Sequence, residues 1–100
     1  MKAYELLSDE TAWCQNAFAK TYDGFPSHPQ DAASAQWCLL GALERCYGRS
    51  GIILKGRPIA AHLFGLRPEE PVAQGPIETW NDARARTYAE VVGLLKRLDI

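Results

Sequence analysis

The residues with the clearest potential for recognition chemistry lie close together near position 80. Trp80, Asn81 and Asp82 are consecutive, and Arg84 and Arg86 follow them. Tryptophan and arginine are the residue types most enriched among the side chains that dominate binding interfaces. The two arginines lie near the expected start of a helix, where positive charge meets the positive end of the helix dipole and needs an offset. A partner protein or an anionic ligand would supply that offset, so these five residues form the candidate binding site.

The same residues also allow a purely structural interpretation. Glu90 follows Arg86 by four residues, which is the spacing of an ion pair on a helix, and other acidic residues nearby would serve equally. In this interpretation Trp80 packs on the central helix of the fold. Asn81 and Asp82 then form hydrogen bonds to the start of the last helix. The residue types and their spacing leave both interpretations open.

Catalytic and metal-binding patterns are weak in the rest of the sequence. Cys38, His62 and Asp82 contain the groups of a nucleophile, a base and an orienting acid, but no local signature accompanies them. Cys38 also lies in an apolar run, where a buried thiol is usually inert. The cysteines and histidines lack the short paired spacings of zinc ligands. We therefore expect no enzymatic activity, no cofactor and no metal.

The net charge of the chain argues against nucleic acid as the partner. The 100 residues carry 11 Lys and Arg against 12 Asp and Glu, for a formal net charge of −1. Neither half of the chain has the basic excess of a protein that grips nucleic acid through its phosphates. Nucleic-acid binding is accordingly the weakest hypothesis, and its candidate residues are Arg49, Lys55, Arg57, Arg84 and Arg86.

The sequence predicts a cytoplasmic protein. Its N-terminal residues lack the apolar core of a signal peptide, and no apolar run approaches the ~20 residues that a membrane helix needs. Three cysteines without a Cys-x-x-Cys pair are typical of a reducing compartment. With 47% hydrophobic and 23% charged residues, the composition is that of one globular domain spanning residues 1–100.

The elements that must position the candidate site are organised around the apolar run from Trp37 to Leu43. This run lies within a helical pattern from about 31 to 47, and a helix that is apolar nearly all round is one that other elements surround. Gly41 and Ala42 are small enough to let another backbone approach closely. We therefore expect a mainly α fold of about four helices packed around a central helix over 31–47.

Local signals place the later elements. Thr87 and Glu90 have the spacing of a capping box at the start of the last helix, and Asn81 or Asp82 is a candidate cap for an earlier turn of that helix. Pro58 at a first helical position and Gly65 at an end mark another helix. The proline-rich residues 67–79 between these two helices are expected to form a long loop.

The region before the central helix is ambiguous. Residues 2–7 fit a short first helix. From 12 to 22 the apolar spacing favours a helix, but Asp23-Gly24 lies between aromatic residues and is a tight-turn signal. A short β-hairpin near 13–26 is therefore the alternative.

Several short motifs are spread along the chain. They are Trp37-Cys38-Leu39-Leu40-Gly41-Ala42, Trp80-Asn81-Asp82 and Arg86-Thr87-Tyr88-Ala89-Glu90-Val91, with an earlier match over Trp13–Ala17 and Tyr22–Gly24. Together they resemble a family of small uncharacterised proteins of bacteria and their phages. Asn16 stands where that family has glycine, which leaves the local backbone there open. The resemblance implies a compact, mainly helical domain and a shared structural or binding role for Trp80–Asp82, but no activity. A phage origin would direct the protein at a host defence or regulatory protein.

Together these observations predict a small non-catalytic interaction protein, inhibitory or regulatory, that binds another protein. The alternative is a domain that binds a small molecule or nucleotide in a pocket near Trp37, Trp80, Asn81, Asp82 and Arg86. The sequence leaves the oligomeric state undetermined. A symmetric dimer would need an exposed apolar patch, for which Phe25, 52–54 and Val72 are candidates.

Overall fold

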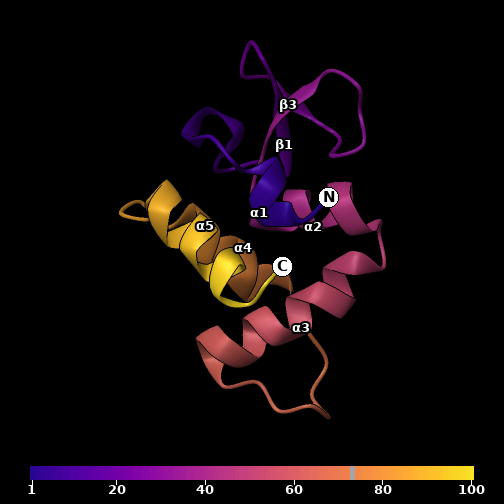
Figure 1. Ribbon diagram of the computed structural model, residues 1–100, viewed down its shortest axis with the longest axis vertical. Helices are drawn as coiled ribbons and strands as arrows, with labels where there is room; N and C mark the ends of the chain where they lie inside the picture. Colours follow the sequence, from indigo (N-terminus) through magenta and orange to yellow (C-terminus); the bar gives the residue numbers. More distant parts are fainter. Residues whose placement is uncertain (73) are drawn as a thin grey trace.

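The computed structural model describes residues 1–72 and 74–100. Within them the chain forms five α-helices, one 3₁₀ turn and a three-stranded antiparallel sheet. The sheet lies at one end of the long axis and α3 extends towards the other (Figure 1). The expected helical character is confirmed, but the sheet makes "mainly α" too narrow a description. The elements are α1 (Ala3–Leu6), η1 (Glu10–Ala12), β1 (Ala19–Thr21), β2 (Pro26–Ser27), β3 (Ser34–Trp37), α2 (Leu39–Tyr47), α3 (Gly51–Phe64), α4 (Gln74–Asp82) and α5 (Tyr88–Arg97).

The helix expected over 12–22 is wrong, and the alternative hairpin is confirmed. β1 pairs with β2 on one side and with β3 on the other, both antiparallel. Two residues explain why this region forms a hairpin and not a helix, because Asn16 has a φ of 66° and Gly24 has a φ of 87°. Both values lie in the left-handed region, which asparagine and glycine tolerate and which a continuous right-handed helix cannot contain.

The helix expected over 31–47 begins later than predicted. Its first half contains β3, which pairs with β1, and α2 starts at Leu39. Cys38 is therefore the N-cap of α2 rather than a mid-helix residue, and its sulfur accepts a hydrogen bond from the Gly41 backbone N–H at 3.3 Å. Pairing with β1 supplies backbone hydrogen-bond partners along one side of 34–37, so tertiary context overrides the local spacing.

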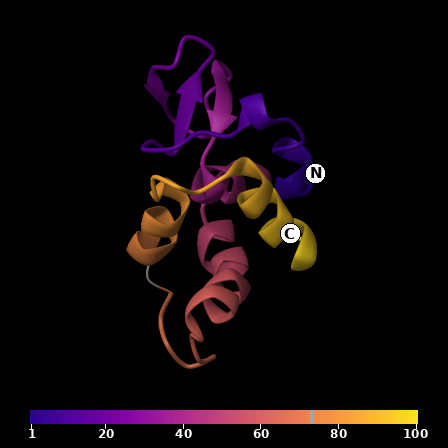
Figure 2. The same ribbon diagram turned by 90° about the vertical axis from the view of Figure 1, so that its left-hand side faces the viewer.

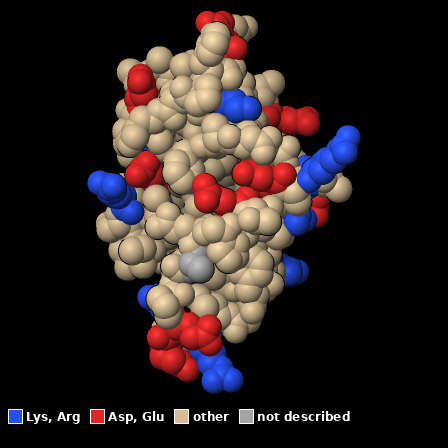
Figure 3. Space-filling view, turned by 180° about the vertical axis from the view of Figure 1, so that it is seen from behind, with Lys and Arg blue, Asp and Glu red and all other residues tan. Residues whose placement is uncertain are grey.

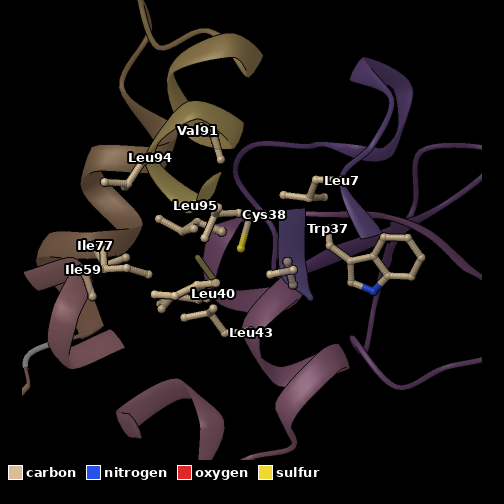
Figure 4. Packing of buried hydrophobic residues seen from close by; sticks show 14 of the residues in the cluster. Leu7, Trp37, Cys38, Leu40, Leu43, Ile59, Ile77, Val91, Leu94 and Leu95 are labelled. Atoms are coloured by element: carbon tan, nitrogen blue, oxygen red, sulfur yellow. The ribbon is translucent and has the colours of Figure 1, made fainter. Parts of the chain in front are cut away.

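The central position of α2 is confirmed. Its first five residues are all buried. Figure 4 shows Leu40, Leu43 and Leu95 pointing towards Ile59 and Ile77 of the neighbouring helices. The predicted close approach of a second backbone also occurs. A Cβ atom added at Gly41 would lie 1.8 Å from the Phe18 carbonyl oxygen. Because only glycine leaves room there, the sheet and α2 pack in direct backbone contact.

Helix α3 begins at Gly51, earlier than the predicted start at Pro58, so that Pro58 lies inside it. Proline cannot donate to the carbonyl of Leu54 four residues earlier, but both residues are exposed, so that water can replace the donor. Gly65 ends α3 with a left-handed φ of 68°, as predicted. Helix α4 begins at Gln74, within the expected long loop over 67–79, so that loop is shorter than predicted.

Helix α5 begins as predicted. Thr87 Oγ1 accepts from the Glu90 N–H at 3.2 Å, and Glu90 Oε1 accepts from the Thr87 N–H at 3.0 Å. Asn81 and Asp82 end α4 instead of capping α5, so that expectation is wrong. Figure 2 shows α5 with both chain ends on one side of the molecule and α4 on the other. No helix in the described part of the chain has the length and apolar character that crossing a membrane requires.

Candidate functional site

Asn81 lies at the centre of the polar cluster near position 80. Its side chain is 1% exposed and uses all four of its hydrogen-bonding positions. Its Oδ1 accepts from Trp13 Nε1 at 2.9 Å and from the Leu39 backbone N–H at 3.1 Å. Its Nδ2 donates to the Cys14 carbonyl at 3.2 Å and to Asp82 Oδ1 at 2.8 Å. Asn81 therefore joins α4 to the segment before β1 and to the first turn of α2.

Asp82 and Gln15 complete this connection. Asp82 Oδ1 accepts from the Asn16 backbone N–H at 2.9 Å, where the chain adopts its left-handed turn. The Gln15 amide donates to the carbonyls of Asn81 at 2.9 Å and Ala83 at 3.0 Å. These two acceptors lie at the C-terminal end of α4, where helix carbonyls lack helical donors. Gln15 therefore satisfies carbonyls at the end of α4, and the Asn16 N–H holds the Asp82 side chain.

Arg86 is held by Trp80 and Glu90. Its guanidinium carbon lies 4.0 Å from the centroid of the Trp80 ring, and its Nε donates to the Trp80 carbonyl at 2.9 Å. Its Nη1 donates to Glu90 Oε2 at 2.8 Å. The backbone N–H of Thr87, its hydroxyl and then Arg86 hold the pKa of Glu90 below its ordinary value. The positive charge at the start of α5 is thus offset within the chain by the capping-box carboxylate.

Of the five candidate residues, Arg84 is the one that projects into solvent. It is exposed, and it makes no hydrogen bond or ion pair within the described residues. Trp80 is partly buried and packs against the hydrophobic core. The structure therefore brings Trp80, Asn81, Asp82 and Arg86 together through internal contacts, while Arg84 stays available.

Trp37 does not share a site with Trp80 in the way the alternative prediction requires. Its indole N–H donates to the Pro29 carbonyl at 3.0 Å, and the guanidinium of Arg45 lies 5.4 Å from its ring centroid. Trp80 instead borders a shallow hollow of about 350 Å³ with residues of α3 and α5, His62 and Arg97 among them. Of the residues of the predicted pocket, Trp37 therefore has surroundings different from those of Trp80.

Cys14 and Cys38 are buried in surroundings that disfavour the reactive thiolate. Burial raises the pKa of Cys38 to about 12 and that of Cys14 to about 11. Both groups are therefore neutral thiols at physiological pH, and the thiolate is the reactive form. Within residues 1–72 and 74–100, no group of three or more His, Cys, Asp or Glu side chains is placed to hold a metal ion.

A larger cavity lies away from the candidate site near position 80. It has a volume of about 620 Å³ and opens between the sheet, the loop before β3 and the meeting point of α2, α3 and α4. His28 Nε2 lies 3.8 Å from Glu44 Oε2 in its wall. The lining residues come from distant parts of the chain, so no local spacing could have indicated them. Six of them are Phe18, His28, Gln30, Glu44, Arg49 and Ile53.

The fold and the polar cluster define a small α+β domain in which a Trp-Asn-Asp segment connects the sheet to the helices. The chain belongs to a family of unknown function, DUF6197, whose sequence model matches residues 1–98. The predicted resemblance to an uncharacterised family is confirmed at this level, while the recurrence of its motifs and a bacterial or phage origin stay predictions. Comparison with curated proteins and with solved structures found no match.

Proposed function

We propose that this protein is a non-catalytic interaction protein that binds another protein through the tip of its β-hairpin. The observation that carries this proposal is the exposure of two aromatic side chains there, Tyr22 at 88% and Phe25 at 67%. The hairpin projects from the sheet end of the molecule, away from the helices (Figure 1). Aromatic residues at a projecting tip contribute little to the core, whereas they are the residue types that anchor protein interfaces.

Hydrogen bonds within the hairpin define the turn at its tip. The Thr21 N–H donates to the Phe25 carbonyl at 2.8 Å, and the Gly24 N–H donates to the Thr21 carbonyl at 2.9 Å. The Thr21 hydroxyl accepts from the Phe25 N–H at 3.2 Å. These bonds fix the turn in the free protein, so the hairpin tip would lose less conformational entropy when a partner binds. Arg84 is the one residue of the sequence-predicted site that remains available as a second contact.

Charge supports a protein partner over nucleic acid. Three of the five basic residues considered for nucleic acid have internal contacts: Arg57 donates to the Pro68 and Glu70 carbonyls, Lys55 lies over the Tyr47 ring, and Arg86 pairs with Glu90. On the face that Figure 3 shows, acidic side chains gather near the middle and basic ones lie mostly at the margins. Binding to phosphates would need the opposite arrangement. By the resemblance described above, the proposed partner is a host defence or regulatory protein.

The proposal is tested by affinity capture from lysate with a double variant, Tyr22→Ser/Phe25→Ser. Phe64→Ser is the matched control, because Phe64 is an aromatic residue that is 48% exposed at the far end of α3. We expect a stoichiometric partner with the parent and with Phe64→Ser, and its loss with the tip variant. An Arg84→Ala variant tests the second contact. Capture that is equal for the parent and the tip variant would contradict binding through the hairpin.

A further inference from the structure

We propose that the 620 Å³ cavity beside the sheet, termed here the Glu44 cavity, binds a small zwitterion of the α-amino acid class. Phe18, His28, Glu44, Arg49 and Ile53 define it. Its volume falls within the range of small-molecule sites, about 300–1,000 Å³. Its walls combine an acid, a base and apolar side chains, which matches a ligand that has an ammonium group, a carboxylate and an apolar side chain. This site is separate from the hairpin tip, so the inference does not depend on the function proposed above.

Glu44 would receive the ammonium group. Its side chain is only 12% exposed, yet no hydrogen bond to its carboxylate occurs within the described residues. The Gln30 amide that lies nearby donates to the Glu44 backbone carbonyl instead, at 2.6 Å. No fully buried side-chain oxygen in the described residues lacks a partner, so the carboxylate reaches open space through the cavity. A recessed carboxylate with unused acceptor positions favours a cationic donor.

His28 does not occupy those acceptor positions. Its Nδ1 accepts from the Gln30 backbone N–H at 3.0 Å, so a neutral ring has its proton on Nε2. That Nε2 lies 3.8 Å from the Glu44 carboxylate, which is too long for a hydrogen bond. The imidazole thus lies beside Glu44 without forming a hydrogen bond to its carboxylate.

Arg49 would receive the carboxylate of the ligand. It is exposed in the turn after α2, and its guanidinium makes no ion pair or hydrogen bond within the described residues. A guanidinium matches a carboxylate in two parallel hydrogen bonds. Phe18 and Ile53 leave 41% and 49% of their surface exposed, so an apolar ligand side chain would bury apolar surface on both residues. A nucleotide fits less well, because its phosphates would face Glu44 and have one arginine to balance them.

The test is a calorimetric titration of the intact protein with each of the common free L-amino acids, with leucine and phenylalanine as leading probes. Binding should be saturable, and removing one charge from the ligand should weaken it. N-acetyl-leucine has no ammonium group, and leucine amide has no carboxylate. We expect each analogue to bind about tenfold more weakly or worse than leucine, which is the scale of one lost charge-assisted hydrogen bond.

Variants assign the two ends of the ligand. Glu44→Gln should weaken binding of the free amino acid about tenfold and abolish its advantage over the N-acetyl analogue. Arg49→Gln should abolish its advantage over the amide. Glu69→Gln is the matched control, because Glu69 is exposed in the loop after α3 and lies outside the cavity. Binding to this control should equal binding to the parent.

Three outcomes would overturn the proposal. One is the absence of saturable binding for every amino acid up to about 10 mM. Another is equal binding of leucine and its N-acetyl analogue to the parent protein, a result that needs no variant and so survives any folding defect. The last is unchanged binding to a folded Glu44→Gln protein.

Discussion

At the scale of single residues, Asn81 shows why the polar cluster near position 80 is so dense. A buried amide is costly unless both its oxygen and its nitrogen are satisfied. Trp13, Cys14, Leu39 and Asp82 supply the four partners, and they come from three separate segments. The Trp-Asn-Asp segment therefore works as a connection between elements.

Replacing Asn81 with alanine should destabilise the protein strongly. Asn81→Ala leaves the Trp13 indole N–H, the Leu39 N–H and the Cys14 carbonyl without their partner. Each buried group left unsatisfied costs about 1–3 kcal/mol, so we expect a loss of about 3 kcal/mol or more in the free energy of unfolding. Urea denaturation measures it. Arg84→Ala, which changes an exposed side chain, should stay within about 0.5 kcal/mol of the parent. Equal stability of the two variants would contradict the role assigned to Asn81.

At the scale of elements, glycine at position 41 decides how the sheet meets α2. The Phe18 carbonyl accepts from the Cys38 N–H at 3.1 Å and lies where a Cβ of residue 41 would be. Cys38, which donates to this carbonyl, is also the N-cap of α2. The end of β3, the start of α2 and the residue before β1 are thus fixed together by backbone contact.

Two glycine-to-alanine variants should change stability in opposite directions. Gly41→Ala places a methyl group 1.8 Å from backbone oxygen, and we expect a loss of about 3 kcal/mol because backbone cannot move aside as a flexible side chain can. Gly93→Ala lies in α5 with no atom within 4 Å of the new Cβ. There the higher helix propensity of alanine should stabilise the protein by about 0.5–1 kcal/mol. Thermal unfolding measures both, and a similar shift for both variants would contradict the close approach at Gly41.

The same elements show what the sequence could predict. Helix α5 was predictable because its signals, a capping box and a regular apolar stripe, lie within the helix itself. The split of 31–47 into β3 and α2 was not, because β3 depends on pairing with β1 from far along the chain. The ion pair between Arg86 and Glu90 was predictable from their separation of four residues. The Glu44 cavity was not, because the residues that meet in it are separated by up to 56 positions, from Phe18 to Gln74.

At the scale of the whole molecule, the sheet and the helices are tied together in several places. One connection lies on the side where α4 meets α2. There Asn81 accepts from the Leu39 N–H, and Gly41 lets the backbone of Phe18 approach α2 closely. Arg45 of α2 forms another, because its guanidinium donates to the carbonyls of Pro29 at 3.0 Å and Asp31 at 3.1 Å in the loop before β3. Tyr47 also accepts from the Ala3 N–H at 3.3 Å, which attaches α1 to α2. Because these contacts join the sheet and the loop beside it to the helices, we expect the sheet to lose its structure when the helices unfold.

We therefore expect the protein to unfold in a single transition. Trp37 is the last residue of β3 and Trp13 forms a bridge to it, so two of the three tryptophans report on the sheet end by fluorescence, whereas far-ultraviolet circular dichroism reports mainly on the helices. In urea the two signals should give the same midpoint, the mark of a two-state transition in a small domain. Asn81→Ala should lower both midpoints together, because it weakens the shared connection. A fluorescence midpoint well below that of circular dichroism would instead mean that the sheet unfolds as a separate unit, and that the polar cluster serves the sheet alone.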